Sequence, residues 1–241
     1  MILNLNAIKQ ELNEDYKYRI ELHAHSKPVS PCSEIPPEDL IRIYKDLGFH
    51  ALVLTNHFMI FNYEQKKDEY LKSYIEAYEK CVELGERAGI KVLFGTEIRF
   101  TENQNDYLIY GVNKELLNDI YDFLPYGIEN FRKNYPLDNS VFIQAHPFRK
   151  GIELVNPELL DGIEVYNLHP NHNSRVAVAS AYAKENGKDI ITIGTDFHHP
   201  GHEGLTALRS KILPDDSFDL ANILKSKDYI FEVANNNLII P

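Results

Sequence analysis

The feature that most constrains this chain is a repeated pattern, in which six short apolar stretches each run directly into polar residues. The stretches are YRIEL, ALVLT, VLFGT, VFIQA, GIEVY and IITIGT, and they lead in turn into His23 and His25, Asn56 and His57, Glu97, His146, Asn167, and Asp196 and His198. Such short runs, bounded by polar turn residues, are typical of buried strands. Parallel strands separated by helices carry their functional groups at their carboxyl ends. The sequence therefore predicts that these polar side chains gather at one edge of a sheet or barrel.

The gathered side chains are of the types that bind divalent metal ions. Imidazoles suit zinc and iron, and carboxylates add oxygen ligands that also accept manganese. His23 and His25 lie two residues apart on an expected strand, so their side chains point to the same face. Asp196 and His198 repeat that spacing at the end of another strand. A lone histidine is usually structural, but a set of ionisable groups at buried strand ends would suffer uncompensated desolvation unless it bound an ion.

Size and charge limit the possible classes of protein. A length of 241 residues suits a single α/β barrel, and no composition break divides the chain, so we expect one domain over residues 1–241. The net charge of −11, from 36 acidic and 25 basic residues, argues against a broad nucleic-acid surface. Two cysteines are too few for a disulfide framework, and no apolar run is long enough to span a membrane. We therefore expect a cytoplasmic protein.

The remaining pattern predicts an alternation of helices and strands. Pro36 and Pro37, followed by two acidic residues, indicate a helix start, and Gly48 indicates its end. Further helices are expected over residues 63–87, 114–123, 128–134 and 175–186. Two more strands are expected over 106–111 and 229–234, which makes about eight in all and favours a parallel sheet closed into a barrel.

Five of these segments resemble a known family. ELHAHS, LTNH, GTEIRF, QAHPFR and GTDFHH are similar, in this order, to the motifs of the polymerase and histidinol phosphatase (PHP) family of metal-dependent phosphoesterases. The resemblance runs from about Tyr18 to His199 and so covers most of the chain. It implies an α/β fold, namely a distorted (β/α)7 TIM-like barrel with its metal site at the C-terminal ends of the strands. It also implies two or three divalent ions, which the ligand types allow to be zinc, manganese or iron.

The resemblance also implies how the ligands are shared between the ions. The first ion would be held by His23, His25, Glu97 and Asp196. A second ion would share Glu97 and take His146. A third would use His57 and His198.

The chain departs from the family pattern at three places. The usual Thr-Asp-His reads Thr55-Asn56-His57, which keeps the imidazole and changes only its neighbour. The family's histidine after the bridging glutamate has no counterpart, and Asp106 is the nearest candidate to replace it. The segment after the first histidine pair reads SKPVSPCSE, in which Cys32 and Glu34 are the candidate ligands for the third ion.

These assignments predict hydrolysis of a small phosphomonoester by a metal-activated water. Glu97 would bridge two ions, and His198 or a water would protonate the leaving alkoxide. Arg149 and Arg99 follow two of the ligands closely, and a guanidinium suits bidentate recognition of phosphate. His169, His172, His199 and His202, together with Asn173, are expected either to shape the substrate pocket or to be simple loop residues. His50 is expected to be structural.

Three other functions stay open on the sequence. Amidohydrolases also begin with His-x-His on a first strand, but they usually end on a lone aspartate and often carry a carboxylated lysine. Here the last strand ends in Asp-x-His and Glu97 occupies the bridging position, which favours phosphoester hydrolysis. The second alternative is nuclease activity. The third is a non-catalytic metal-binding module, since PHP domains also occur within replicative polymerases. The acidic balance favours a small phosphomonoester over nucleic acid. The pattern does not identify the substrate, the metal or the oligomeric state.

Overall fold

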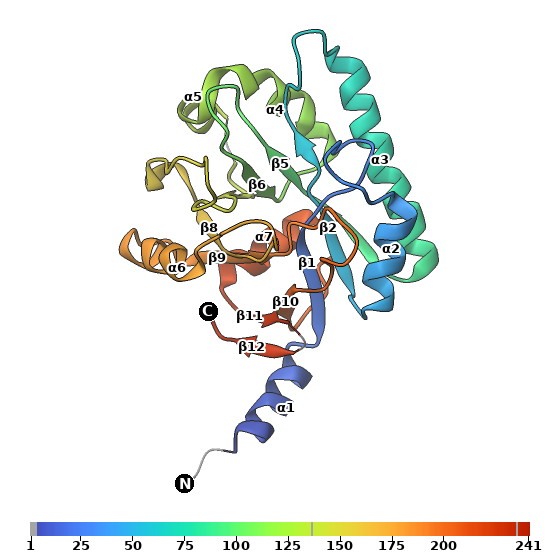
Figure 1. Cartoon of the computed structure of the whole chain (residues 1–241), viewed down its shortest axis with the longest axis vertical. Helices are drawn as coiled ribbons and strands as arrows, with labels where there is room; N and C mark the ends of the chain where they lie inside the picture. Colours follow the sequence, from blue (N-terminus) through green and yellow to red (C-terminus); the bar gives the residue numbers. More distant parts are fainter. Residues whose placement is uncertain (1–3, 136, 235) are drawn as a thin grey trace.

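The computed structural model describes residues 4–135, 137–234 and 236–241. Within these residues the strands form two six-stranded sheets, with most of the helices packed around them (Figure 1). The strands of the first sheet are, in spatial order, β12 (Asn237–Ile239), β11 (Tyr229–Val233), β10 (Thr206–Ser210), β1 (Tyr18–Ala24), β2 (Ala51–Leu54) and β4 (Lys91–Phe94). Those of the second are β3 (His57–Phe58), β5 (Thr96–Ile98), β6 (Tyr107–Tyr110), β7 (Val141–Gln144), β8 (Gly162–Asn167) and β9 (Ile190–Gly194).

The helices come between the strands along the chain. The α-helices are α1 (Leu5–Asp15), α2 (Pro37–Asp46), α3 (Lys67–Ala88), α4 (Leu117–Phe123), α5 (Gly127–Asn134), α6 (Val176–Glu185) and α7 (Ser217–Ser226). Short 3₁₀ turns are η1 (Lys114–Leu116), η2 (Leu124–Tyr126) and η3 (Pro157–Leu159). A mixed α/β fold, as predicted, is confirmed. Among the described residues, none of the helices combines the length and the apolar character that crossing a bilayer requires.

The two sheets are joined by continuous stretches of chain. Only Thr55 and Asn56 separate β2 from β3, and only Gly95 separates β4 from β5, so each run begins in the first sheet and ends in the second. On the other side, Ala24 at the end of β1 forms a parallel bridge with Phe197, which follows β9. The backbone N–H of Phe197 donates to the carbonyl of His23 at 3.1 Å. The strand ends of both sheets therefore meet at one edge.

The expected parallel sheet is wrong in part. β6 runs antiparallel to both β5 and β7, and β10 runs antiparallel to β1 and β11. Ile98 ends β5 and Tyr107 begins β6, and this connection is too short for the crossover of about a dozen residues that parallel neighbours need. The reversal brings the beginning of β6, and with it Asp106, to the edge where the neighbouring strands end. The seven-stranded barrel stays a prediction.

The predicted helices are all present, with two displaced starts, since α4 begins at Leu117 after the 3₁₀ turn η1 and not at the predicted Lys114. α2 has Pro37 in its first turn, followed by Glu38 and Asp39, as the pattern indicated. α3 begins at Lys67 instead of the predicted Tyr63. Side chains hold the chain before it in turns, because Asn62 Oδ1 accepts from the N–H of Glu64 at 2.9 Å and Gln65 Oε1 accepts from that of Phe61 at 3.1 Å. Such local bonds compete with the helical hydrogen bonds of the backbone.

Six of the described α-helices and strands were not predicted: α1, α7, β3, β5, β10 and β12. None of the residues of α1 is buried, and Figure 1 shows this helix extending away from the sheets, so no core-facing stripe marks it in the sequence. β10 reads TALRS, and its arginine interrupts the apolar pattern. Arg209 is nevertheless buried, because its guanidinium Nη1 pairs with Glu232 Oε2 on β11 at 2.9 Å.

Apolar side chains from both sheets form a shared core. One cluster contains Leu22, Val53, Tyr110, Ile143 and Ile193, which come from five different strands of the two sheets. A second cluster packs α2 and α3 against the first sheet, and a third packs α3 to α6 against the second. These layers support the strand ends from below, and buried polar side chains add links between them, such as the bonds of Thr195 N and Oγ1 to Glu21.

Candidate metal centre

The predicted metal ligands all lie at the edge where the strands of the two sheets meet. They are His23 in β1, His25 just past it, His57 in β3, Glu97 in β5, Asp106 just before β6, His146 just past β7, and Asp196 and His198 just past β9. All are buried except His57, whose side chain keeps 13% of its exposure. The structure therefore brings together side chains that are up to 175 positions apart, from His23 to His198.

The residues assigned to the first ion surround a common point. His23 Nε2 lies 3.3 Å from Glu97 Oε1 and 3.5 Å from Asp196 Oδ1. His25 Nε2 lies 3.5 Å from Glu97 Oε2 and 3.4 Å from the same Asp196 oxygen. Ligand atoms bound tetrahedrally at 2.0–2.2 Å would be about 3.3–3.6 Å apart, so these spacings fit one cation.

The residues assigned to the second ion lie next to those of the first and share Glu97 with them. His146 Nε2 is 3.1 Å from Glu97 Oε1 and 3.7 Å from Asp106 Oδ2. Asp106, the candidate for the missing family histidine, thus faces the position that it was expected to fill. Its carboxylate also binds Arg99, with Nε–Oδ1 and Nη2–Oδ2 distances of 2.6 and 2.7 Å.

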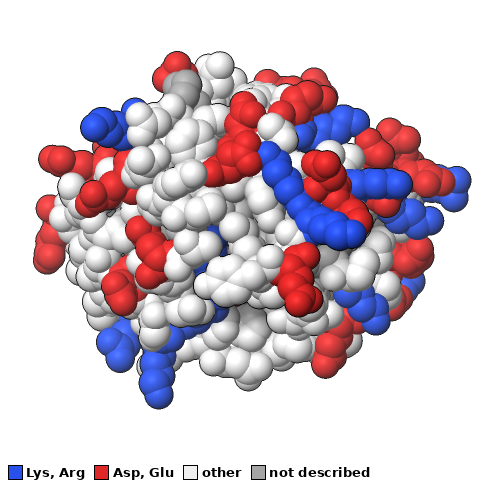
Figure 2. Space-filling view, turned by 90° about the horizontal axis from the view of Figure 1, so that it is seen from above, with Lys and Arg blue, Asp and Glu red and all other residues white. Residues whose placement is uncertain are grey.

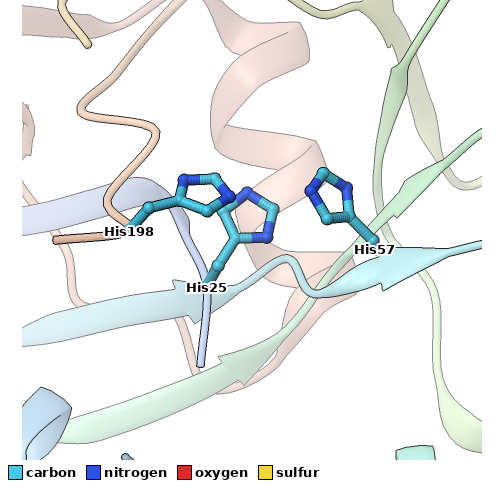
Figure 3. Close-up of side chains that lie close together, drawn as sticks. All are labelled: His25, His57 and His198. Carbon is cyan, nitrogen blue, oxygen red and sulfur yellow. The ribbon is translucent and has the colours of Figure 1, made fainter. Parts of the chain in front are cut away.

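The residues assigned to the third ion form a cluster with His25. Figure 3 shows the imidazoles of His25, His57 and His198 close together, and one ring nitrogen of each lies within 4.8 Å of the others. Cys32 lines the same cleft as His57 and His198. Glu34 does not join this cluster, because its carboxylate is 68% exposed and lies 3.5 Å from His199 Nδ1.

Several buried atoms in this cluster have no hydrogen-bond partner. They are His23 Nε2, His25 Nε2, His57 Nδ1 and Glu97 Oε2, and each lies close to other members without hydrogen-bond geometry. A buried polar atom without a partner costs about 1–3 kcal/mol. Lone pairs that converge in this way fit a divalent cation, so the residues present suit the ions that the ligand types imply.

The charges of the cluster are strongly coupled. Burial disfavours a charged His57, but Glu97 outweighs it and raises the pKa of this imidazole to about 10. Burial likewise opposes ionisation of Glu97, yet His57 and His23 hold its pKa well below the ordinary value. Burial, with His198 and His57 nearby, lowers the pKa of His25. Glu97 is therefore ionised and His25 neutral, which are the states in which these side chains bind metal ions.

Two of the ligands sit on unusual backbone. His146 and Asp196 have φ values of 30° and 54°, in the left-handed region that residues other than glycine rarely adopt. Strain of this kind is found at ligand-binding and active sites, where the surrounding structure holds it. Here it turns both side chains back toward the cluster directly after their strands.

The family model of the PHP domain matches residues 21–236. This chain belongs to the PHP domain family. Comparison with the curated proteins gives no match.

Solved structures with the same fold as this PHP domain come from several bacteria. A two-domain protein from Bacteroides vulgatus ATCC 8482, described as containing a predicted PHP-like metal-dependent phosphoesterase, is 16% identical with a TM-score of 0.60. The match covers 90% of this chain but only 64% of that protein. PsfC from Pseudomonas syringae PB-5123 is 15% identical with a TM-score of 0.54, over 79% of this chain and 80% of that one. At these identities the likeness shows the fold alone.

A cleft opens beside the metal cluster of the PHP domain. Its volume is about 550 Å³, and it is lined by Pro31, Cys32, His57, Met59, Phe61, Arg99, His146, Arg149, His169, Asn171, His172, Asp196, His198 and His199. The predicted phosphate-binding Arg149 and Arg99 are both among these residues. Arg149 Nη2 also lies 3.3 Å from Asp106 Oδ2, so one carboxylate contacts both guanidinium groups.

The other predicted histidines fall into two groups. His169, His172 and His199 line the cleft, and the rings of His169 and His172 stack with their centroids 4.0 Å apart. His202 packs edge-on to His169, and Asn173 is exposed. His50 lies elsewhere, where its Nδ1 accepts from the backbone N–H of Arg19 at 3.2 Å, in keeping with a structural role.

Two residues of the site were missed or undervalued by the sequence analysis. Glu164 lies within β8 and is buried beside His23, yet it was hidden in the middle of the apolar run GIEVY. His172 was treated as a pocket or loop residue, but its Nδ1 lies 3.3 Å from Asp196 Oδ2. The only sequence signal for Glu164 is an acidic residue inside a strand that is expected to be buried. A buried carboxylate requires a hydrogen-bond or ion-pair partner, and the sequence does not show which residue that is.

Proposed function

We propose that this PHP domain is a metal-dependent phosphoesterase that hydrolyses a small phosphomonoester. The observation that carries the proposal is the arrangement of His23 and His25, whose Nε2 atoms each lie 3.3–3.5 Å from carboxylate oxygens of both Glu97 and Asp196. Family membership supports metal-dependent phosphoester chemistry, and the 550 Å³ cleft beside the cluster supports a small substrate.

The ligands divide among the proposed ions as the resemblance implies. His23, His25, Glu97 and Asp196 would hold the first ion, Glu97 with His146 and Asp106 the second, and His57 with His198 the third. This mixed set of nitrogen and oxygen ligands accepts zinc, manganese or iron. Bound divalent ions supply Lewis-acid charge and lower the pKa of water, which provides a nucleophile near neutral pH.

The chain's own side chains would bind and orient the phosphate. Arg99 and Arg149 reach the cleft from the residues that follow β5 and β7. Asp106 binds Arg99 through two hydrogen bonds and so holds its guanidinium toward the cleft. Two guanidinium groups at the mouth suit the oxygens of a phosphomonoester, which they recognise through paired N–H donors.

His198 is the proposed proton donor to the leaving alkoxide. Its Nδ1 lies 2.9 Å from the backbone oxygen of Asp196, so Nδ1–H donates there and Nε2 is the atom available to the cleft. The ring can bind an ion through Nε2 only when that atom carries no proton. Proton donation by His198 therefore applies where the third position is empty, and a water takes the role where it is filled.

The proposed fold is a distorted seven-stranded barrel. Its strands would be β1, β2, β4, β6, β7, β8 and β9. The bridge between Ala24 and Phe197 supports closure on one side, and the runs from β2 into β3 and from β4 into β5 support it on the other. We also propose a cytoplasmic location, on composition alone.

A small substrate is preferred to nucleic acid on charge. Figure 2 shows acidic and basic side chains interspersed over the face seen from above, and the chain as a whole carries a net charge of −11. Binding to the nucleic-acid backbone rests on neutralising several phosphates at once. The guanidinium pair of the cleft matches a single phosphate group instead.

The proposal is tested by assaying the protein loaded with Zn²⁺, Mn²⁺ or Fe²⁺ against p-nitrophenyl phosphate, a panel of phosphomonoesters, cyclic amides and single-stranded DNA. We expect turnover of phosphomonoesters, reduced by 10³-fold or more in Glu97→Gln, on the order expected when metal-dependent catalysis is removed. Circular dichroism should show Glu97→Gln to be folded. Turnover of amides or DNA alone, or full activity of Glu97→Gln, would overturn the proposal.

A further inference from the structure

Glu164 is a buried carboxylate that touches the metal cluster without belonging to it. It lies in β8 with 1% of its surface exposed. Its Oε1 is 2.8 Å from His23 Nδ1. Its Oε2 accepts from the backbone N–H of His146 at 2.9 Å and from Asn167 Nδ2 at 3.0 Å.

These contacts require a side chain that only accepts hydrogen bonds. The N–H of His146 and the amide of Asn167 are both donors, so the oxygen between them cannot be replaced by a donor. The remaining oxygen, Oε1, then meets His23 Nδ1, and an ionised carboxylate can accept there as well. His23 Nδ1–H can therefore donate to Oε1, and Nε2 faces Glu97 Oε1 at 3.3 Å and Asp196 Oδ1 at 3.5 Å, where it can bind an ion once it carries no proton.

We propose that Glu164 is a positioning residue that holds His23 in the tautomer able to bind the first ion through Nε2. A ligating histidine commonly donates its other N–H to a carboxylate, and this partner sets the orientation and basicity of the ring. The inference rests on the metal-binding part of the proposed function and not on phosphoester hydrolysis. It therefore stands or falls on metal binding by the protein.

Glu164 also contacts, directly or through one residue, two more candidate metal ligands. Through the backbone N–H it fixes His146 at a position with left-handed φ, directly after β7. Asn167 Nδ2, which donates to Glu164, also lies 3.3 Å from Asp196 Oδ2. One side chain therefore contacts His23 and His146 directly and Asp196 through Asn167, which couples ligands from β1, β7 and β9.

Glutamine at position 164 separates these roles from mere packing. Glutamine has nearly the shape of glutamate, but its NH2 group must face either the two donors, His146 N–H and Asn167 Nδ2, or His23 Nδ1. In the first orientation two donors meet a third, and in the second His23 is driven toward the tautomer that carries its hydrogen on Nε2. The first orientation keeps the His23 tautomer but leaves the donors of His146 and Asn167 without an acceptor, and the second reverses the tautomer. Each therefore disturbs the metal ligands, although the buried volume hardly changes.

Glu232 provides a matched control far from the metal cluster. It is also a buried glutamate in a strand, and it pairs with Arg209 Nη1 at 2.9 Å and Arg19 Nη2 at 3.0 Å. Glu232→Gln should lower the stability of the protein, because removing one partner of a buried ion pair is strongly destabilising. It should leave the affinity for metal unchanged, since none of its contacts reaches the cluster.

The experiment measures Zn²⁺ affinity by competition with a chromophoric chelator for the wild type, Glu164→Gln and Glu232→Gln. We expect affinity at the first site to fall about 10- to 100-fold in Glu164→Gln, the usual cost of losing such a partner, and to stay at the wild-type value in Glu232→Gln. The visible spectrum of the Co²⁺-loaded protein should change only in Glu164→Gln. Equal affinity and spectra in wild type and Glu164→Gln would overturn the inference.

A measurement on the wild type keeps the inference testable if Glu164→Gln does not fold. In ¹⁵N-detected NMR of the Zn²⁺-loaded protein, His23 should show a protonated Nδ1 and a metal-bound Nε2. A protonated Nε2 would overturn the inference. Metal binding without phosphoester turnover would sink the proposed hydrolase and leave this inference standing, whereas a wild type that binds no metal would sink both.

Discussion

At the scale of single residues, Glu97 is the group on which the cluster is built. Its Oε1 faces His23 and His146, and its Oε2 faces His25 and His57, so one carboxylate contacts four imidazoles. A carboxylate with two oxygens can bridge two ions in this way, which a neutral imidazole, with one available lone pair, cannot. The residues around it differ in their proposed roles, because some are candidate metal ligands and others are candidate substrate contacts.

Arg149 belongs to the second kind, and its replacement tests the proposed phosphate recognition. Hydrogen bonds to charged groups contribute about 1.5–3 kcal/mol, so Arg149→Gln should lower kcat/KM for a phosphomonoester about 10- to 100-fold, chiefly through a higher KM. Metal affinity at the first site should be unchanged, because Arg149 contacts none of the residues assigned to that ion. Steady-state kinetics would measure this, with Arg132→Gln as a control because Arg132 pairs with Asp161 outside the cleft. An unchanged KM would show that Arg149 serves only to pair with Asp106.

Most of the candidate ligands could be predicted because they stand where a recognisable apolar strand ends. His23, His146 and Asp196 each follow an apolar run, and their chemistry identifies them. Glu164 could not be found in this way, since it lies inside its strand and its partners come from β1 and β7. Contacts between distant strands depend on the register and twist of the sheets, which a single sequence does not reveal.

At the scale of elements, the strand β9 lies closely against β1 and β8, and this packing limits its sequence. A Cβ atom at Gly194 would lie 2.5 Å from His23 Cβ and 2.6 Å from Glu164 Oε1. Glycine therefore allows His23 and Glu164 to meet beneath the cluster. The sequence showed only a glycine near the end of an apolar run, which is also the signal of a turn.

Gly194→Ala should consequently displace His23 and Glu164, the two side chains that a Cβ atom at this position would meet. We expect it to lower stability by about 1–3 kcal/mol, as overpacking usually does, and to weaken Zn²⁺ binding. Urea unfolding and zinc titration would measure the two effects. Gly187→Ala serves as the control, because a Cβ there has no neighbour within 4 Å and only its φ of +63° makes it unfavourable. Wild-type affinity in Gly194→Ala would contradict this account of the packing.

The reversed strand β6 shows why element order was easier to predict than direction. Its apolar run was recognised, and its position between helices suggested a parallel neighbour. Direction is decided by the length and path of the connections, and the one from Ile98 to Tyr107 is short. For the same reason Asp106 reaches the cluster from before its strand, while the other ligands do so within or just after theirs.

At the scale of the whole molecule, the polar groups that matter for binding and those that matter for stability lie apart. The metal cluster occupies the edge where the strand ends meet. The buried pairs of Glu232 with Arg19 and Arg209 join β1, β10 and β11 elsewhere in the first sheet. The binding of ions should therefore add to the stability of the fold without depending on those pairs.

This separation leads to an expectation for metal addition. A ligand at 100 times its dissociation constant stabilises the folded state by about 2.7 kcal/mol. For a chain of this size the Tm should then rise by about 5–11 °C, at about 2–4 °C for each kcal/mol. Differential scanning fluorimetry with Zn²⁺ or Mn²⁺ and with EDTA would measure the shift, and Glu97→Gln should show a smaller one. A Tm that does not respond to metal would argue against binding at the cluster.

The left-handed backbone at His146 and Asp196 has a consequence for the history of the chain. Glycine at either position would relieve a conformation that costs other residues about 1–2 kcal/mol, and it would also delete a ligand. Selection for thermal stability alone would therefore favour glycine at these positions and remove two of the candidate metal ligands. Bulky side chains with metal-ligand chemistry at two such bends are what a chain would carry if function, and not stability, decided these positions.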